Sequence, residues 1–235
     1  MRIQFILTFL TPFLFFFPAT GQSQTQTPSS FDEQVRQVLL RNPEIILEVF
    51  AILEDQQRVE TSASDQQIIE QFSNELFGDN ADASHSILVE FSDYQCGYCR
   101  QSAPVVASIL AENPEITLRL IELPILGEKS REYAAKMLAI RSLYGEETYM
   151  ELHRLFLGGR GGELQNFDAV IAERGLSPQR VYEVANTDPI QETIAANLAL
   201  ADAMGIGGTP GFVTRTDIIR GFVQKPVLLE ALSGS

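Results

Sequence analysis

The chain has little of several residue types on which many binding and structural sites depend. Its 235 residues include two cysteines, two histidines and no tryptophan. Two cysteines exclude a framework of several disulfides. A structural zinc site needs about four ligands close together, and the two histidines, His85 and His153, are scattered, so we do not expect such a site. Basic residues are also scarce, with 17 against 31 acidic ones and a net charge of −14. We therefore predict no metal, no cofactor and no nucleic-acid partner.

The two cysteines stand together in the motif Cys96-Gly97-Tyr98-Cys99. Thiols at this spacing pass between dithiol and disulfide without rearranging a fold, which is typical of reversible redox chemistry. Residues 87–91 predict a buried strand and residues 100–112 a helix. Cys96 is thus expected at a helix N-terminus, where unpaired N–H groups and the helix dipole stabilise a thiolate. A structural disulfide is the alternative, although so short a loop adds little chain-entropy stabilisation.

This spacing suggests a separate role for each residue of the motif. Cys96 is expected nearer the surface, as the nucleophile that forms a mixed disulfide with a substrate. Cys99 lies one turn into the helix and is expected to resolve that mixed disulfide. Gly97 would let a substrate chain approach closely, and Tyr98 adds bulk and one hydroxyl.

Two other positions are candidates for the same site. Glu90 lies inside an apolar strand, where a carboxylate is costly unless it has a partner or a function. It is either a proton acceptor and donor for Cys99, with a raised pKa, or a side chain that points to solvent from the other face. Thr209-Pro210, with glycines on both sides, is either an ordinary turn or a cis-proline loop whose backbone pairs with an extended substrate. His85 and His153 are expected at the surface or in local hydrogen bonds.

The N-terminus has the pattern of a targeting segment. Met1-Arg2 is followed by an apolar run of about 15 residues, shorter than the about 20 that span a bilayer, and then by Ala19-Thr20-Gly21. We predict a signal peptide over residues 1–21 and a periplasmic protein, with an uncleaved anchor as the alternative. Such a compartment allows disulfides to persist.

Residues 22–62 predict a helical oligomerisation stalk after a polar leader. Ser30 and Glu33 form a capping box for a helix to about Arg41, and Asn42-Pro43 starts a second helix toward Glu60. Apolar residues recur at spacings of four and three, and a narrow hairpin cannot bury them all. The stalk therefore packs either on the rest of the chain or on copies of itself. The small residues of Thr61–Ser64 predict a break and a hinge.

Residues 63–235 predict an α/β domain. A second strand is expected over 115–123, a helical block over about 128–204, a hairpin around 212–219 and a final helix from Pro226. A strand–helix–strand start and a strand–strand–helix end are the thioredoxin arrangement, here with a helical insertion.

These segments together resemble the DsbA family of thiol–disulfide oxidoreductases. The resemblance lies in residues 89–100, in Leu123–Gly127 and in Gly208-Thr209-Pro210. It implies that Glu90 is a buried carboxylate, Cys96 the nucleophile, Cys99 the resolving thiol and Pro210 cis. The glycine after Pro210 departs from the Ala or Thr that is frequent in the family, so substrate contacts there are expected to differ.

Residues 42–48 resemble the stalk of the ScsC subgroup, which implies a homo-oligomer, with a trimer favoured, assembled through residues 30–60. Thr209 before the proline is similar to isomerases and reductases more than to oxidases. The leading hypothesis is therefore a disulfide isomerase or reductase that acts on unfolded or wrongly paired secreted proteins and exchanges electrons with a membrane redox partner. Alternatives are a monomeric DsbA-type oxidase and, less favoured because no Met or His cluster accompanies the thiols, a copper-binding protein.

Overall fold

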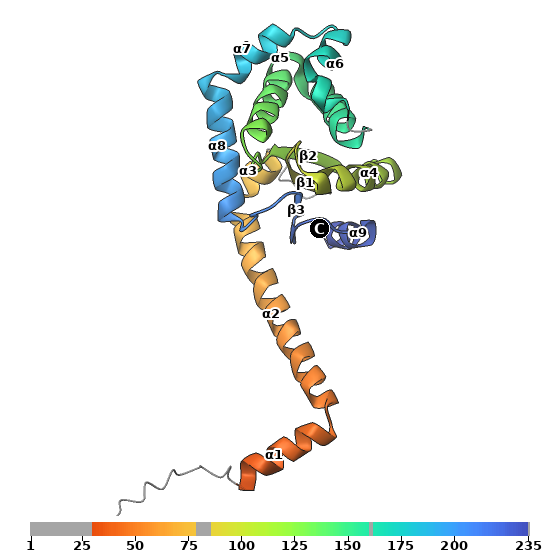
Figure 1. Cartoon of the computed structure of the whole chain (residues 1–235), viewed down its shortest axis with the longest axis vertical. Coiled ribbons are helices and arrows are strands. Elements are labelled where there is room, and N and C mark those ends of the chain that lie inside the picture. Colours follow the sequence, from red (N-terminus) through yellow and green to blue (C-terminus); the bar gives the residue numbers. More distant parts are fainter. Residues whose placement is uncertain (1–29, 79–85, 160–161, 235) are drawn as a thin grey trace, which may run out of the picture. The chain divides into compact units, whose positions relative to one another are not determined.

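The computed structural model describes residues 30–78, 86–159 and 162–234 (Figure 1). The expected signal peptide, the polar leader and His85 lie outside these residues. The chain divides into two compact units, one that ends at Leu53 and one from Glu54 to Ser235. Within the described part of the chain, no helix combines the length and the apolar character that crossing a membrane requires.

The described residues of the first unit form helix α1 (Ser30–Arg41) and the beginning of helix α2 (Glu44–Gln71), as the capping pattern predicted. Asn42 closes α1, because both its backbone N–H and its side-chain amide donate to the carbonyl of Val38, at 3.0 and 2.8 Å. No residue of α1 is buried. The exposed large apolar side chains of this unit are Phe31, Val35, Val38, Leu40, Ile46, Leu47, Val49, Phe50, Ile52 and Leu53.

The predicted break at Thr61–Ser64 is wrong, because α2 continues through these residues to Gln71. Small polar residues cost a helix only a fraction of what glycine or proline costs, and α2 contains neither. Asp65, which follows these residues in α2, accepts two hydrogen bonds from the Arg220 guanidinium, at 2.9 and 2.8 Å. This bidentate ion pair fixes the last turns of α2 within the second unit.

A four-stranded sheet forms the centre of the second unit, in the order β2-β1-β3-β4. Strand β1 (Ile87–Ser92) pairs in parallel with β2 (Thr117–Glu122) and antiparallel with β3 (Gly211–Val213), which pairs antiparallel with β4 (Ile218–Arg220). This is the predicted thioredoxin arrangement.

The two faces of β1 are covered by different helices. Leu88 packs in one core cluster with residues of α4 (Gly97–Glu112) and α9 (Lys225–Ser233). Val89 and Phe91 pack in another with residues of α2, α3 (Ser73–Phe77) and α8 (Asp188–Ala203). Because side chains alternate along a strand, Glu90 shares its face with Leu88 and lies toward α4.

The helical insertion follows β2 (Figure 1). It begins with α5 (Glu128–Gly158), which is kinked at Gly145 where φ is 90° and ψ is 173°. The 3-10 helix η2 (Leu164–Asn166), α6 (Phe167–Glu173) and α7 (Pro178–Ala185) follow. Helix α8 then leads back to β3, so the insertion joins the two halves of the thioredoxin fold as predicted.

Candidate active site

The two thiols lie at the start of α4. Cys96 is the N-cap of this helix, with φ −78° and ψ 120°, and its Sγ accepts the backbone N–H of Cys99 at 3.3 Å. The same Sγ donates to the carbonyl oxygen of Thr209 at 3.1 Å. Cys96 is 6% exposed and Cys99 is 0% exposed, so Cys96 is the thiol that a substrate can reach.

Asp93 shapes the turn that presents Cys96. Its carboxylate accepts the N–H groups of Gln95 at 2.8 Å, Ile125 at 3.0 Å and Leu126 at 3.2 Å. Its carbonyl oxygen accepts the N–H of Cys96 at 3.0 Å. An aspartate that bonds the backbone two residues on is a standard turn former, and here it also ties the turn to the loop after β2.

The loop before β3 brings Thr209 and Pro210 to the dithiol. The Thr209–Pro210 peptide bond is cis, as the resemblance implied. A difference in substrate contacts is not needed to explain why residue 211 is a glycine. Gly211 is buried in β3, and a Cβ there would lie 2.6 Å from Cγ2 of Ile206, so internal packing requires a glycine.

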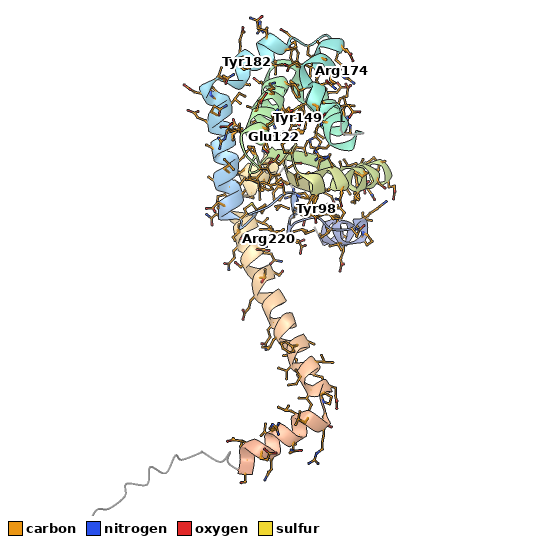
Figure 2. The ribbon with its side chains drawn as sticks, in the orientation of Figure 1. Tyr98, Glu122, Tyr149, Arg174, Tyr182 and Arg220 are labelled. Carbon is orange, nitrogen blue, oxygen red and sulfur yellow. The ribbon has the colours of Figure 1, made fainter. Side chains whose placement is uncertain are left out.

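Gly97 and Tyr98 are both exposed beside Cys96. A Cβ on Gly97 would meet no atom within 4 Å, so this position borders open space. Tyr98 is 61% exposed (Figure 2), and its ring stacks on Phe222 with centroids 6.3 Å apart. Phe222, in the loop after β4, was not predicted, because no local pattern places it next to the motif.

Burial raises the pKa of the Cys99 thiol to about 12. Hydrogen bonds from the Asp93 backbone, Ser92 and Thr209 oppose this shift without cancelling it. Cys99 therefore keeps its proton at neutral pH until a nearby base removes it.

Glu90 is buried, at 1% exposure, so the alternative that it points to solvent is wrong. Burial raises the pKa of its carboxyl to about 8, and the neighbouring Ser92 opposes the shift. Burial prevails, since Glu90 Oε1 has no hydrogen-bond partner among the described residues. A carboxyl with such a pKa can both accept and donate a proton near neutral pH.

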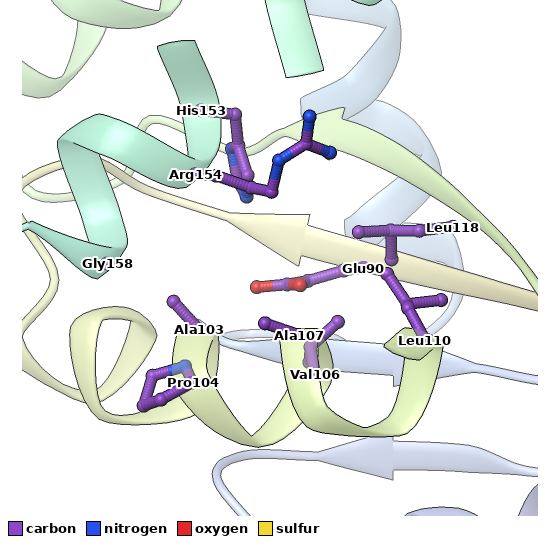
Figure 3. Close-up of a pocket in the computed structure, with 10 residues that line it drawn as sticks. All are labelled: Glu90, Ala103, Pro104, Val106, Ala107, Leu110, Leu118, His153, Arg154 and Gly158. Carbon is purple, nitrogen blue, oxygen red and sulfur yellow. The ribbon is translucent and has the colours of Figure 1, made fainter. Parts of the chain in front are cut away.

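Glu90 contributes to a pocket of about 320 Å³ (Figure 3). The pocket lies between α4 and α5, and Ala103, one turn beyond Cys99 on α4, is part of its wall. Its lining residues are Glu90, Ala103, Pro104, Val106, Ala107, Leu110, Leu118, His153, Arg154 and Gly158. The pocket thus gives the Glu90 carboxyl space beneath the same helix that carries both thiols.

Other residues near the site were not predicted to belong to it. His153 is buried, not at the surface, and it bonds Tyr94. Tyr94 and Tyr149 both bond the carboxylate of Glu122, the last residue of β2. Glu122 carried the same signal as Glu90, a carboxylate in an apolar strand, and the same argument could have found it.

A cysteine pair at a helix N-terminus, next to a cis-proline loop on a thioredoxin sheet, defines a thioredoxin-fold protein with an exchangeable dithiol. The model of the DSBA-like thioredoxin domain matches residues 87–233, so the chain belongs to the DsbA-like family of thiol–disulfide oxidoreductases. No curated protein matches the sequence.

Several solved structures are similar to this chain. BcfH from Salmonella enterica Typhimurium is 25% identical, with 88% of this chain and 94% of that chain covered and a TM-score of 0.65. A thioredoxin-like oxidoreductase from Silicibacter pomeroyi is 30% identical over 68% and 95% of the two chains, with a TM-score of 0.60. ScsC from Proteus mirabilis, in a transitional conformation, shares the fold at 23% identity over 86% and 95%, with a TM-score of 0.60.

Proposed function

We propose that this protein is an extracytoplasmic disulfide isomerase or reductase that acts on unfolded or wrongly paired secreted proteins. The observation that carries the proposal is the position of Cys96 Sγ, which accepts the N–H of Cys99 at the start of α4 and contacts the carbonyl of Thr209. In this position a thiolate is stabilised by the helix N-terminus and lies beside a backbone segment to which a substrate chain can pair.

In the first step, the Cys96 thiolate attacks one sulfur of a substrate disulfide. A Cys96–substrate disulfide forms, and the other substrate sulfur leaves as a thiolate. In isomerisation this released thiolate attacks another disulfide of the substrate, and a substrate thiolate finally displaces Cys96. The dithiol is then regenerated, and no electrons are gained or lost overall.

Reduction follows a second route from the same mixed disulfide. Glu90 takes the proton of Cys99, and the Cys99 thiolate attacks the Cys96 sulfur. The Cys96–Cys99 disulfide forms, the substrate thiolate leaves, and the substrate has gained two electrons. A membrane redox partner must then return two electrons to the dithiol. Cys99 holds its proton at neutral pH because its pKa is about 12, and with a pKa of about 8 Glu90 is deprotonated in part of the molecules, which can accept that proton.

The exposed surface around Cys96 suits an extended, unfolded substrate. The backbone of Thr209 and Pro210 would pair with the substrate main chain, Gly97 would leave room for it, and the Tyr98 ring would contact apolar side chains. Such a surface would bind the main chain of a substrate more than any particular side-chain sequence, as a catalyst with many substrates requires.

We further propose that residues 22–62 form a stalk that joins copies of the chain, with a trimer favoured through residues 30–60. The exposed apolar side chains of α1 and the first half of α2 support this, because so many large apolar side chains in water are unfavourable without a partner. BcfH matches over 88% of this chain, so the similarity extends beyond the catalytic domain into these helices. Several dithiols in one assembly raise the local thiol concentration around a bound substrate.

The domain boundaries belong to the same proposal: a signal peptide over 1–21, the stalk, and a catalytic domain over 63–235 with its insertion at about 128–204. The second compact unit begins at Glu54, so a truncation at this residue leaves that unit whole. A periplasmic location is proposed from the leader and from the need for an oxidising compartment.

The test is the reactivation of a scrambled multi-disulfide protein by residues 22–235, by residues 54–235 and by the Cys96→Ala variant of the longer chain. We expect reactivation by the long chain, little by the truncated chain and none by Cys96→Ala. If both wild-type forms oxidise a reduced substrate and neither reactivates the scrambled one, the protein is a DsbA-type oxidase. If the two wild-type forms contain the same number of chains per particle in solution, the stalk does not drive assembly.

A further inference from the structure

Four buried polar side chains lie behind the dithiol and have no part in the exchange steps above. The hydroxyls of Tyr94 and Tyr149 donate to the same oxygen, Oε1 of Glu122, at 3.0 and 2.6 Å. Nδ1 of His153 lies 3.1 Å from the Tyr94 hydroxyl. Figure 2 shows Glu122 and Tyr149 where β2 meets the helical insertion. Burying four polar groups is costly, and their mutual contacts reduce that cost, although Glu122 Oε2 has no hydrogen-bond partner among the described residues.

The hydrogen bonds determine which nitrogen of His153 carries the proton. A tyrosine hydroxyl has one hydrogen, and that of Tyr94 is given to Glu122. While the Tyr94 hydrogen is donated to Glu122, the Tyr94 oxygen accepts from His153, which corresponds to the tautomer with the proton on Nδ1. Burial lowers the pKa of His153 to about 3, so the ring is neutral and Nε2 holds a lone pair. Figure 3 shows the ring on the wall of the pocket that also contains Glu90.

This cluster holds the segment that leads to the nucleophile. Tyr94 lies between β1 and α4, two residues before Cys96, and its carbonyl oxygen accepts a hydrogen bond from Arg100 at 3.1 Å. Its side chain reaches His153 in α5 and Glu122 at the end of β2. Tyr94 is thus held by the helical insertion on one side and by the active-site helix on the other.

We propose that Glu122 and His153 are positioning residues, which hold Tyr94 and through it set the place of Cys96 against α4 and the Thr209 carbonyl. The inference rests on the proposed role of Cys96 as the nucleophile. The helical insertion therefore takes part in the exchange reaction, because it supplies one of the two side chains that fix Tyr94. Tyr149 donates to Glu122 as well and its hydroxyl interacts with that of Tyr94, but Tyr149 itself belongs to α5 and not to the segment before Cys96.

The test compares Tyr94→Phe with Tyr149→Phe. Tyr94→Phe removes the hydroxyl that joins Glu122 and His153 to the segment before Cys96. Tyr149→Phe removes a hydroxyl that donates to the same carboxylate oxygen from α5. The readouts are the alkylation rate of Cys96 by iodoacetamide as a function of pH and the equilibrium constant for oxidation by glutathione. We expect Tyr94→Phe to change both by about fivefold and Tyr149→Phe to leave both within about twofold of the wild type. Equal effects in the two variants, or none in Tyr94→Phe, would overturn the proposal.

A second pair of variants tests the hydrogen bond from His153. His153→Asn keeps an N–H group near the position of Nδ1, whereas His153→Leu removes it. We expect His153→Leu to change alkylation as Tyr94→Phe does and His153→Asn to restore it to within about twofold of the wild type. If asparagine does not restore the rate, His153 does not act through Tyr94. Alkylation needs only a reactive thiol, so it remains informative even if the wild type fails to reactivate a scrambled substrate, a result that would refute the proposed function alone.

Discussion

The reduced protein should become less stable as the pH rises from 6.5 to 7.5, because it holds two buried carboxyl groups. Burial raises the pKa of Glu90 and of Glu122 from an ordinary 4.5 to about 8. Tyr94 and Tyr149 oppose the shift at Glu122 through their hydrogen bonds. Between the two pKa values the unfolded chain has released each proton and the folded chain still holds it. The unfolded state then binds fewer protons, so the free energy of unfolding falls as the pH rises.

His153 acts in the opposite direction at lower pH. Burial lowers its pKa from 6.5 to about 3, so between these values the unfolded state binds one proton more and stability rises with pH. From pH 5 to 6 the folded state holds two more carboxyl protons than the unfolded state, and the unfolded state holds one more histidine proton. The net difference of one proton lowers the free energy of unfolding by about 1.4 kcal/mol per pH unit. Above pH 6.5 His153 no longer contributes, and the two carboxyls together give a slope of up to about 3 kcal/mol per pH unit.

Urea unfolding of the reduced protein, followed by tyrosine fluorescence at pH 5.5, 6.5 and 7.5, measures this slope. All six tyrosines lie between residues 94 and 182 and there is no tryptophan, so the signal reports on the second compact unit. Glu90→Gln and Glu122→Gln should each reduce the slope above pH 6.5 to about 1.4 kcal/mol per pH unit. A wild type whose stability is flat or rises over this interval, or variants that keep the full slope, would refute the reasoning.

Three other predictions concern single positions. Cys99→Ala should accumulate mixed disulfides with a substrate on non-reducing gels, and rapid release would show that Cys99 does not resolve them. Asp65→Asn breaks a bidentate ion pair and should lower the free energy of unfolding by about 2 kcal/mol; the change is moderate because the Arg220 side chain is still 34% exposed. As a control, substitution of the exposed Asp202 by Asn should change the free energy of unfolding by less than about 0.5 kcal/mol. Gly211→Ala should cost about 1–3 kcal/mol because its Cβ would overlap a buried isoleucine, whereas Gly97→Ala should fold normally; equal thermal stabilities would contradict the packing argument.

Local patterns were sufficient to predict most of the catalytic domain. The apolar run of β1 and the motif that starts α4 are contiguous in sequence, and α7 begins with a local signal, Ser177 as N-cap followed by Pro178. The same reasoning was wrong at Thr61–Ser64, where the composition favours a break only weakly. The ion pair that opposes a break there joins Asp65 to a residue 155 positions away, which no local pattern can reveal.

The sequence was sufficient to predict the chemistry of the candidate site, but not the contacts that hold its residues in place. The cysteines and the cis proline follow from spacing and resemblance, but the burial of Glu90 had to be decided by which helix covers its face of β1. The bonds of Tyr94 span 28 and 59 residues, to Glu122 and to His153. Such contacts depend on how the helical insertion docks on the sheet, and sequence periodicity contains no information on docking.

The described sheet ends in two edge strands, and both limit self-aggregation. β4 has three residues and ends in Arg220, and β2 carries Arg119 at its middle. An edge strand of three residues and an edge strand with a central arginine are poor templates for an incoming strand. A catalyst of the proposed kind would meet extended, apolar segments of its substrates. With these edges it would bind a substrate at the loop around Thr209 without offering the rest of its sheet for amyloid-like growth.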